Sequence, residues 1–202
     1  MLSIAITGGI ACGKSLVASF LTEQSVSVCE TDELAHNVME KDSNVYNQIV
    51  NRFGTDILMP DGRINRKKLG VRVFSDFNEL RDLNAIVHPV VKNLWCTWLD
   101  DERKRESTEG RAVISAVVIP LLYEIGAHEG WDAVICVWAP LWRQIAFLSQ
   151  RGLTDSEIRQ RLAAQMPTEQ KAFRADYVIY NNGTIRLLRE QTLRVLRSIQ
   201  GG

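Results

Sequence analysis

A glycine-rich loop near the start of the chain is the segment whose residue types and spacing point most directly to a chemistry. Residues 8–15 read Gly-Gly-Ile-Ala-Cys-Gly-Lys-Ser, which matches the pattern G-x-x-x-x-G-K-[ST] in full. In such a loop, inward-pointing backbone N–H groups bind phosphate oxygens, the lysine reaches the β- and γ-phosphates, and the serine hydroxyl ligates Mg²⁺. The pattern therefore predicts a nucleoside-triphosphate site with Ser15 as a metal ligand. The residues expected to contact the nucleotide are Gly8, Gly9, Ala11, Cys12, Gly13, Lys14, Ser15 and Leu16.

The sequence around the loop predicts the elements that this chemistry requires. A short apolar run at residues 2–7 predicts a buried strand before the loop, and a helical pattern over residues 14–23 follows it. A helix that begins near Lys14 adds its positive N-terminal end to the anion site. A glycine-rich turn that binds nothing is the alternative, and the strand, the lysine and the serine together argue against it.

Asp32 is the best candidate for a base that accepts a proton from an acceptor hydroxyl. It follows the second apolar run, residues 26–29, and the carboxyl ends of parallel strands face the ligand crevice of an α/β sheet. The alternative is that Asp32 or Thr31 only caps the helix expected over residues 33–39. Glu30 lies at the same strand end and could position a Mg²⁺-bound water.

Two common classes of nucleotide-binding protein do not fit the rest of the chain. No Asn-Lys-x-Asp segment is present to read a guanine base, which argues against a GTPase. The apolar run 112–119 ends in Pro-Leu-Leu-Tyr-Glu, whereas motor ATPases and helicases hold Mg²⁺ with an aspartate at such a strand end. Small-molecule kinases remain, in which a base faces the acceptor and a cationic cover closes on the phosphates.

Composition and charge narrow the possible partners and compartment. The 202 residues contain 24 Lys and Arg against 24 Asp and Glu, so no basic excess supports nucleic-acid binding. No run of about 18 apolar residues could span a membrane. Four scattered cysteines without a C-x-x-C pair suit a reducing compartment. We therefore expect a cytoplasmic protein with a small-molecule substrate and without nucleic-acid or membrane partners, as a monomer or a weak oligomer.

The order of the elements predicts an α/β fold. Five short apolar runs alternate with helical patterns and lie at residues 2–7, 26–29, 112–119, 133–138 and 177–180. This alternation indicates a parallel five-stranded sheet flanked by helices. The stretch between the second and third runs is too long for one crossover helix, so we expect it to pack as a helical insertion.

In order along the chain, these motifs and three further segments resemble the dephospho-CoA kinase family. The further segments are His88-Pro89, Pro120-Leu121-Leu122-x-Glu124 and Ala175-Asp176-x-Val178-Ile179-x-Asn181-Asn182-Gly183. The resemblance covers essentially the whole chain. It implies ATP-dependent phosphorylation of the ribose 3′-hydroxyl of dephospho-CoA, the last step of coenzyme A synthesis. It also implies one P-loop kinase domain over 1–202, with a nucleotide-binding core (1–32, 108–139 and 174–202), an acceptor-binding helical insertion (33–107) and a helical lid (140–173).

The resemblance also assigns roles to individual residues. Asp32 matches the family's catalytic base and Lys14 its phosphate-binding lysine. His88 and Leu121 match segments beside the acceptor, and Asn182 matches a loop beside the adenine.

Purely structural roles are the alternative for three of these segments. Residues 89–98 could form a helix that opens at Pro89 with His88 as its cap. Residues 120–124 could be a strand terminator with a packed leucine pair. The Asn-Gly pair at 182–183 could be a turn without further function.

The lid region departs from the family pattern at one position. Family lids commonly carry two arginines four residues apart on one helix face, which contact the transferring phosphoryl group. Here Arg151 matches the second arginine, Phe147 stands at the first position, and Arg143 lies one turn earlier on the same expected face. We expect Arg151 to be the catalytic lid residue, and Arg143 could take part of the missing role.

The phosphate loop departs from the family at residues 11–12, where Ala-Cys replaces the frequent Gly-Ser. Only backbone N–H groups act at these positions, so we expect the chemistry to survive. Because Cys12 lies in an electropositive nest, we expect it to be the most reactive thiol and to be protected by ATP. Two other functions stay open, another small-molecule P-loop kinase and a nucleotide-binding regulatory protein with weak turnover. Phe147 favours the second, and Asp32 disfavours it.

Overall fold

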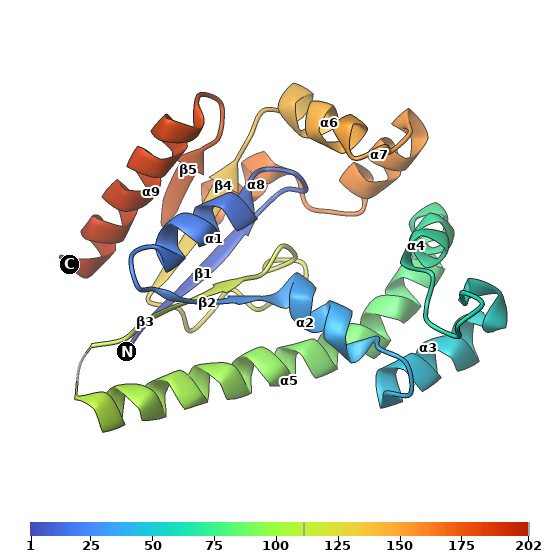
Figure 1. Ribbon diagram of the computed structural model, residues 1–202. Helices are drawn as coiled ribbons and strands as arrows, with labels where there is room; N and C mark the ends of the chain where they lie inside the picture. Colours follow the sequence, from blue (N-terminus) through green and yellow to red (C-terminus); the bar gives the residue numbers. More distant parts are fainter. Residues whose placement is uncertain (111, 202) are drawn as a thin grey trace. The chain divides into compact units, whose positions relative to one another are not determined.

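The computed structural model describes residues 1–110 and 112–201 and divides the chain into two compact units (Figure 1). The core unit contains residues 1–30 and the described part of 98–202, and the helical unit contains residues 31–97. The second division falls inside one long helix, α5 (Phe77–Glu109). The boundaries expected at 33 and 107 concern functional roles and stay predictions.

A five-stranded parallel sheet forms the centre of the core unit (Figure 1). Its strands are β1 (Leu2–Gly8), β2 (Ser27–Glu30), β3 (Ile114–Val118), β4 (Ala133–Trp138) and β5 (Tyr177–Tyr180). They lie in the order β2-β3-β1-β4-β5, and every neighbouring pair is parallel. The predicted fold class is confirmed, and the strands begin and end within two residues of the predicted runs.

One face of this sheet packs against α1 (Lys14–Thr22) and α9 (Ile185–Gln200). Ile4, Ile6 and Ile135 are among the side chains that the strands bury there. Successive strand residues point to opposite faces, so these positions share one side of the sheet. The helices contribute matching apolar side chains, namely Val17, Phe20, Leu21, Leu188, Leu196 and Ile199.

The opposite face of the sheet packs against α8 (Thr168–Arg174), which contacts β1 and β4. The end of α5 lies against the same face. Two charged side chains are buried on this side. Lys171 of α8 is fully buried, and Glu102 of α5 accepts hydrogen bonds from Ser115 on β3, at 3.4 Å, and from Arg105, at 2.9 Å. Buried charges require such partners, because an unpaired charge in a core is strongly destabilising.

Between β4 and α8 the chain forms α6 (Leu141–Gln150) and α7 (Asp155–Ala163). Gly152, with φ +79°, follows the end of α6 and turns the chain out of the helix. A capping box then starts α7, since Thr154 Oγ1 accepts from the Glu157 N–H while the Glu157 carboxylate accepts from the Thr154 N–H. Arg151 therefore lies in the break between the two helices.

The helical unit contains several short helices and the first part of α5. Its other elements are α2 (Thr31–Val38), α3 (Asn44–Phe53), the single turn η1 (Thr55–Ile57) and α4 (Arg66–Ser75). Side chains cap α3 and α4, because Ser43 Oγ accepts from the Tyr46 N–H and Asn65 Oδ1 accepts from the Lys68 N–H. The core of the unit includes Val45, Ile49, Phe53, Ile57, Leu69 and Val73.

Pro89 lies in the interior of α5, so the alternative in which it opens a helix over 89–98 is wrong. Proline lacks an N–H and normally breaks a helix. Here the helix continues through it because a row of buried side chains at four-residue spacing holds both flanks, namely Val87, Val91 and Trp95. Although α5 has 33 residues, neither it nor any other described helix is long and apolar enough to cross a membrane.

Candidate active site

Glycines at both ends of the phosphate loop occupy positions that a side chain would obstruct. Gly8, at the end of β1, has φ +142°, and a Cβ there would lie 2.2 Å from the Val137 carbonyl oxygen. Gly13 has φ +97°, and a Cβ there would lie 2.5 Å from Asn181 Nδ2. Lys14 then begins α1. The loop therefore packs against the ends of β4 and β5 and leads directly into the positive end of a helix.

Ala11 adopts a left-handed backbone conformation with φ +59°. This conformation costs a residue with a Cβ about 1–2 kcal/mol, whereas glycine adopts it freely. The departure from Gly-Ser at residues 11–12 therefore introduces backbone strain. The residue types at positions 11 and 12 could not show this cost, because it depends on the backbone conformation of the folded loop.

The Lys14 side chain folds back onto the loop from which it starts. Its Nζ donates hydrogen bonds to the carbonyl oxygens of Gly8, at 3.1 Å, and Gly9, at 2.8 Å. Both acceptors belong to the loop itself, so these bonds hold a positive charge at the predicted phosphate site.

Ser15 and Glu30 meet at the carboxyl edge of the sheet. Ser15 Oγ donates to the Glu30 carboxylate at 2.9 Å, and Glu30 is the last residue of β2. Hydroxyl and carboxylate oxygens suit Mg²⁺, which in kinases is bound by one or two protein groups together with substrate phosphates and waters. Among the residues that the structure describes, no group of three His, Cys, Asp or Glu could hold a metal alone. The donor set fits a Mg²⁺ that is shared with a nucleotide.

Cys12 is fully buried and belongs to the apolar core of the core unit. Burial raises the pKa of its thiol and outweighs the nearby Lys14 charge and the contact with Thr168 Oγ1 at 3.9 Å, both of which lower that pKa. The expectation of a reactive thiol is therefore wrong. A loop that directs its N–H groups toward an anion can direct a side chain into the core.

A segment that the motif search did not single out covers the phosphate loop. We call residues 165–171 the covering segment. Gln165 Oε1 accepts a hydrogen bond from the Ile10 N–H at 3.0 Å. Thr168 is buried, and a Cβ added to Gly9 would lie 2.1 Å from its Oγ1. Residue 9 must therefore be glycine, because the covering segment lies too close to leave room for a side chain.

Lys171 anchors the covering segment. Its Nζ donates to the Pro120 carbonyl oxygen at 2.6 Å and pairs with the Glu124 carboxylate at 2.7 Å. The same carboxylate accepts a hydrogen bond from the Met166 N–H at 2.9 Å. Residues 120–124 therefore do more than end a strand, because they hold the segment that lies over the loop. No periodic pattern could reveal Lys171, since a buried lysine in a seven-residue helix resembles an exposed one.

Asn181 contacts the phosphate loop. Its side chain is buried, and its Nδ2 donates to the Cys12 carbonyl oxygen at 3.0 Å. Its backbone N–H donates to the Trp138 carbonyl oxygen at 2.7 Å. Asn182 is exposed, and its contact with adenine stays a prediction. The motif contained both asparagines, but residue type alone could not show which one points inward.

Arg151 is the C-cap of α6, the helix that carries Arg143 and Phe147. The chain turns away at Gly152, directly after Arg151, and the shared face expected for the three residues stays a prediction. The Arg143 guanidinium carbon lies 5.5 Å from the centroid of the Phe147 ring. The Arg151 side chain is exposed, and the structure pairs it with no carboxylate among the residues described.

Asp32 is exposed in the first turn of α2, so the expectation that it precedes a helix over 33–39 is wrong. The Asp32 carboxylate can therefore reach solvent or substrate.

The other two predicted acceptor residues lie on different units. His88 is half-buried in the helical unit, and burial lowers the pKa of its imidazole, which favours the neutral form near pH 7. Leu121 is half-buried in the turn that follows β3 in the core unit.

Comparison with known proteins assigns this architecture to a family. The family model for dephospho-CoA kinase matches residues 2–186. The chain belongs to the dephospho-CoA kinase family. A dephospho-CoA kinase of Anaeromyxobacter dehalogenans is 40% identical over 200 residues, which cover 98% of this chain and 92% of the relative. A dephospho-CoA kinase of Shouchella clausii is 42% identical over 182 residues, or 90% of each chain.

A solved structure shares the fold of this chain. The crystal structure of TT1252 from Thermus thermophilus aligns with a TM-score of 0.76 and 31% identity, covering 98% of this chain and 96% of that one. As a member of the dephospho-CoA kinase family, the chain is a P-loop kinase that uses ATP, as the sequence predicted. The individual roles of Asp32, His88, Leu121, Arg151 and Asn182 stay predictions.

Proposed function

We propose that this chain transfers the γ-phosphoryl group of ATP to the ribose 3′-hydroxyl of dephospho-CoA, giving coenzyme A and ADP. The observation that carries the proposal is the complete phosphate loop after β1, in a chain that matches the dephospho-CoA kinase family over residues 2–186. The loop accounts for the phosphoryl donor, and the family accounts for the acceptor.

The donor side uses the loop N–H groups, the positive end of α1 and Lys14. On nucleotide binding, Lys14 exchanges the carbonyl oxygens of Gly8 and Gly9 for phosphate oxygens, which are stronger acceptors because they are charged. Ser15 Oγ and the Glu30 carboxylate would hold Mg²⁺, Glu30 directly or through a water. When bound, the ion neutralises charge on the β- and γ-phosphates.

The acceptor side depends on Asp32. Its carboxylate accepts the 3′-hydroxyl proton while the 3′-oxygen forms its bond to the γ-phosphorus. The bond from that phosphorus to the bridging oxygen breaks, and its electron pair leaves with ADP. Neutral His88 and the apolar side chain of Leu121 line the acceptor.

The lid region and the last strand complete the nucleotide site. The exposed Arg151 guanidinium stabilises the charge that spreads over the equatorial oxygens of the transferring group. A planar guanidinium can bind two such oxygens at once, which an ammonium cannot. Asn182 lies beside the adenine.

The cytoplasm is the compartment in which we place this reaction. The four cysteines, Cys12, Cys29, Cys96 and Cys136, are free, which supports a reducing environment. We propose a monomer that acts on a small molecule and has no nucleic-acid or membrane partner.

A coupled ADP-release assay with purified protein and MgATP tests the proposed function. Dephospho-CoA, adenosine and shikimate are offered in turn, and turnover is expected with dephospho-CoA alone. Turnover with shikimate or adenosine would instead indicate another small-molecule kinase. Intact ATP binding without turnover would indicate the regulatory protein, and Phe147→Arg would then be the first variant to test for restored transfer.

A further inference from the structure

Helix α6 buries a polar side chain and leaves apolar ones exposed. The structure describes every residue of this helix, and Gln144 and Leu148 are the two that it buries. They are four residues apart and therefore lie on one face of the helix. Leu141 and Trp142 are more than half exposed. A buried glutamine is informative, because an amide loses its hydration on burial and is stable there only where it finds partners.

The Gln144 amide lies between the start of α6 and the phosphate loop. Its Nε2 donates a hydrogen bond to the Ala139 carbonyl oxygen at 2.8 Å, in the connection between β4 and α6. Its Oε1 faces the loop, since a Cβ added to Gly9 would lie 2.9 Å from that oxygen. The side chain therefore ties the first turn of the helix to the preceding connection and packs against the loop.

The connection before α6 contacts the same loop through Cys12. Ala139 is fully buried, and a hydrogen bond from its backbone is one of the contacts that oppose the rise in the pKa of the Cys12 thiol caused by burial. Thr168 Oγ1 lies 3.9 Å from the same sulfur. The phosphate loop therefore contacts both ends of the predicted lid region (140–173), through Ala139 and Gln144 at its start and through Thr168 at its end.

Helix α6 extends from this attachment to Arg151. An α-helix rises 1.5 Å per residue, so Gln144 and the C-cap Arg151 lie about 10 Å apart along the axis. Over that length, a tilt of about 6° at the first turn moves the far end of the helix by about 1 Å. A misplacement of about 1 Å far from the reacting atoms can lower the rate of an enzyme ~100-fold.

We propose that Gln144 is a positioning residue for phosphoryl transfer; this role rests on the proposed function, in which Arg151 stabilises the transferring group. Gln144 fixes the first turn of α6 against Gly9. The helix in turn fixes the position of Arg151 relative to the phosphates that the loop binds. Gln144 itself contacts neither substrate and acts through Arg151.

Gln144→Met and Gln150→Met form a matched pair of variants on one helix. Methionine is unbranched and flexible and fills the space of glutamine, but it offers no donor to the Ala139 carbonyl oxygen and no amide at Gly9. Gln150 is exposed at the other end of α6. Both variants replace glutamine by methionine in α6, so a difference between them reports on the buried amide.

Steady-state kinetics separate positioning from binding. Gln144→Met is expected to lower kcat about 10-fold or more, because Arg151 acts on the transition state, while the KM values for ATP and dephospho-CoA stay within about threefold. Gln150→Met is expected to leave all three quantities within about twofold, as is usual for a surface substitution.

Combination with Arg151→Ala tests whether Gln144 acts through Arg151. Two substitutions that act through one group lose their separate effects when combined, whereas the fold-changes of independent substitutions multiply. Gln144→Met is therefore expected to lower the kcat of the Arg151→Ala protein by less than about twofold. If Gln144 acted only on the shape of the loop, the same loss of kcat would appear with and without Arg151.

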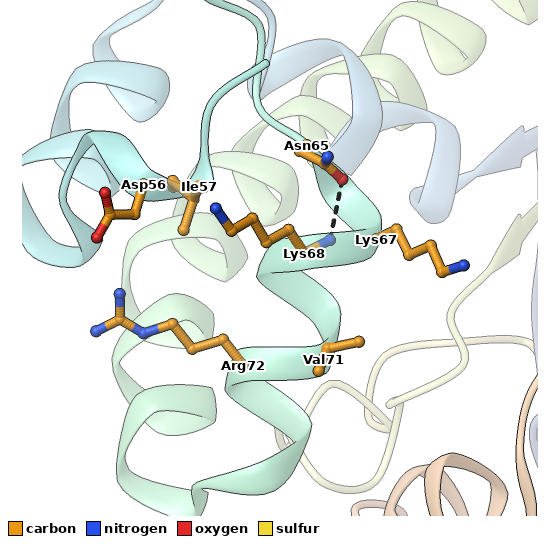
Figure 2. Close-up of a pocket in the computed structure, with 7 residues that line it drawn as sticks. All are labelled: Asp56, Ile57, Asn65, Lys67, Lys68, Val71 and Arg72. Atoms are coloured by element: carbon orange, nitrogen blue, oxygen red, sulfur yellow. Dashed lines mark hydrogen bonds between the residues drawn. The ribbon is translucent and has the colours of Figure 1, made fainter. Parts of the chain in front are cut away.

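Arg72→Met is the control for a general loss of stability. Arg72 borders a cavity of about 470 Å³ in the helical unit (Figure 2), and its guanidinium donates to the Glu79 carboxylate and to the Phe53 carbonyl oxygen. These partners belong to the helical unit, whereas Gln144 belongs to the core unit. The variant should lower the thermal unfolding midpoint, and any effect on kcat should multiply with that of Arg151→Ala.

Four outcomes would overturn the role of Gln144. They are an unchanged kcat in Gln144→Met, an equal loss of kcat in Gln150→Met, full multiplication of the Gln144→Met and Arg151→Ala effects, and a silent Arg151→Ala. If Gln144→Met does not fold, Gln144→Asn takes its place in the same cycle, because its amide is one methylene too short to reach both Ala139 and Gly9.

Failure of the proposed function gives a different result. No turnover of dephospho-CoA by the unaltered protein removes the proposed function and the role of Gln144 together. Turnover by the unaltered protein, with effects of Gln144→Met and Arg151→Ala that multiply, removes the role of Gln144 alone.

Discussion

The phosphate loop and the first turn of α2 hold their functional groups in different ways. The loop uses backbone N–H groups, and buried side chains from distant parts of the chain, including Thr168 and Asn181, hold its shape. The first turn of α2 instead presents the exposed side chain of Asp32, the proposed base. Substitutions around the loop should therefore lower both stability and catalysis. Substitutions on the acceptor side should remove activity and leave the protein stable.

Asp32→Asn provides the largest expected effect and tests the acceptor half of this comparison. The amide cannot accept the proton, so kcat should fall at least ~100-fold, the scale of general-base removal. The free energy of unfolding should stay that of the unaltered protein, since the side chain is exposed. ADP release and urea unfolding measure the two quantities.

Glu33→Gln is the control for that variant, because Glu33 is the next exposed carboxylate in the same helical turn. It should keep kcat within about twofold, since it removes the same charge from the helix start without removing the base. Equal losses of kcat in both variants would show that charge in this turn, and not proton transfer, is what matters.

Lys171→Met tests the loop half of the comparison. Loss of the buried ammonium leaves Glu124 and the Pro120 carbonyl without their partner, so the free energy of unfolding should fall by about 3 kcal/mol, the lower end for a broken buried pair because Glu124 is partly exposed. The affinity for ATP should fall as well, because the covering segment is released from its anchor. Urea unfolding and ATP titration give the two values.

Lys104→Met is the matched change at the surface, where Lys104 pairs with Asp101 at 2.8 Å and both side chains are mostly exposed. It should leave both stability and ATP affinity unchanged. A Lys171→Met protein that is as stable as Lys104→Met would contradict the anchoring role of Lys171.

Ala11→Gly should have a smaller effect, and of opposite sign. Removing the Cβ relieves the left-handed strain, and the extra freedom of glycine in the unfolded chain offsets part of the gain, so the net stabilisation should be about 0.5 kcal/mol. Ala11→Val should instead destabilise the protein by more than about 1 kcal/mol, because a β-branched side chain tolerates this conformation worse. Chemical denaturation gives the free energy of unfolding of both variants. A glycine variant that is less stable than the unaltered protein would contradict the claim that Ala11 is strained.

The smallest expected effect concerns pH and the half-buried His88. Because burial lowers its pKa in the folded protein, the unfolded chain binds a proton more readily once the pH falls below about 6.5. Folding stability that is present above that pH is therefore lost as the pH falls. Urea unfolding of His88→Gln and the unaltered protein between pH 8 and pH 5 should show the variant gaining relative stability toward low pH, and a constant difference would contradict the shift.

The parts of the structure that the sequence predicted correctly are contiguous in the chain. The five strands are apolar runs that can be recognised one at a time, and the phosphate loop is an unbroken eight-residue pattern. Parallel order then follows from alternation with helices. These features need no knowledge of distant contacts, which is why their positions were right to within two residues.

The features that the sequence did not reveal depend on distant contacts. Gln165 and Asn181 reach the loop from 155 and 169 residues away, and no local pattern records such a meeting. Pro89 stays inside α5 because tertiary packing outweighs its local preference. The turn between α6 and α7 did carry a readable signal in Gly152, since glycine commonly follows the end of a helix.

The position of the transferred phosphate tests the central claim most directly. The unaltered protein is incubated with MgATP and dephospho-CoA, and the product is examined by phosphorus NMR and by mass spectrometry. The account predicts a new phosphate monoester on the ribose 3′-oxygen, formed in equal amount with ADP and absent from the Asp32→Asn reaction. ADP without that monoester, or a phosphate at any other position of the acceptor, would contradict it.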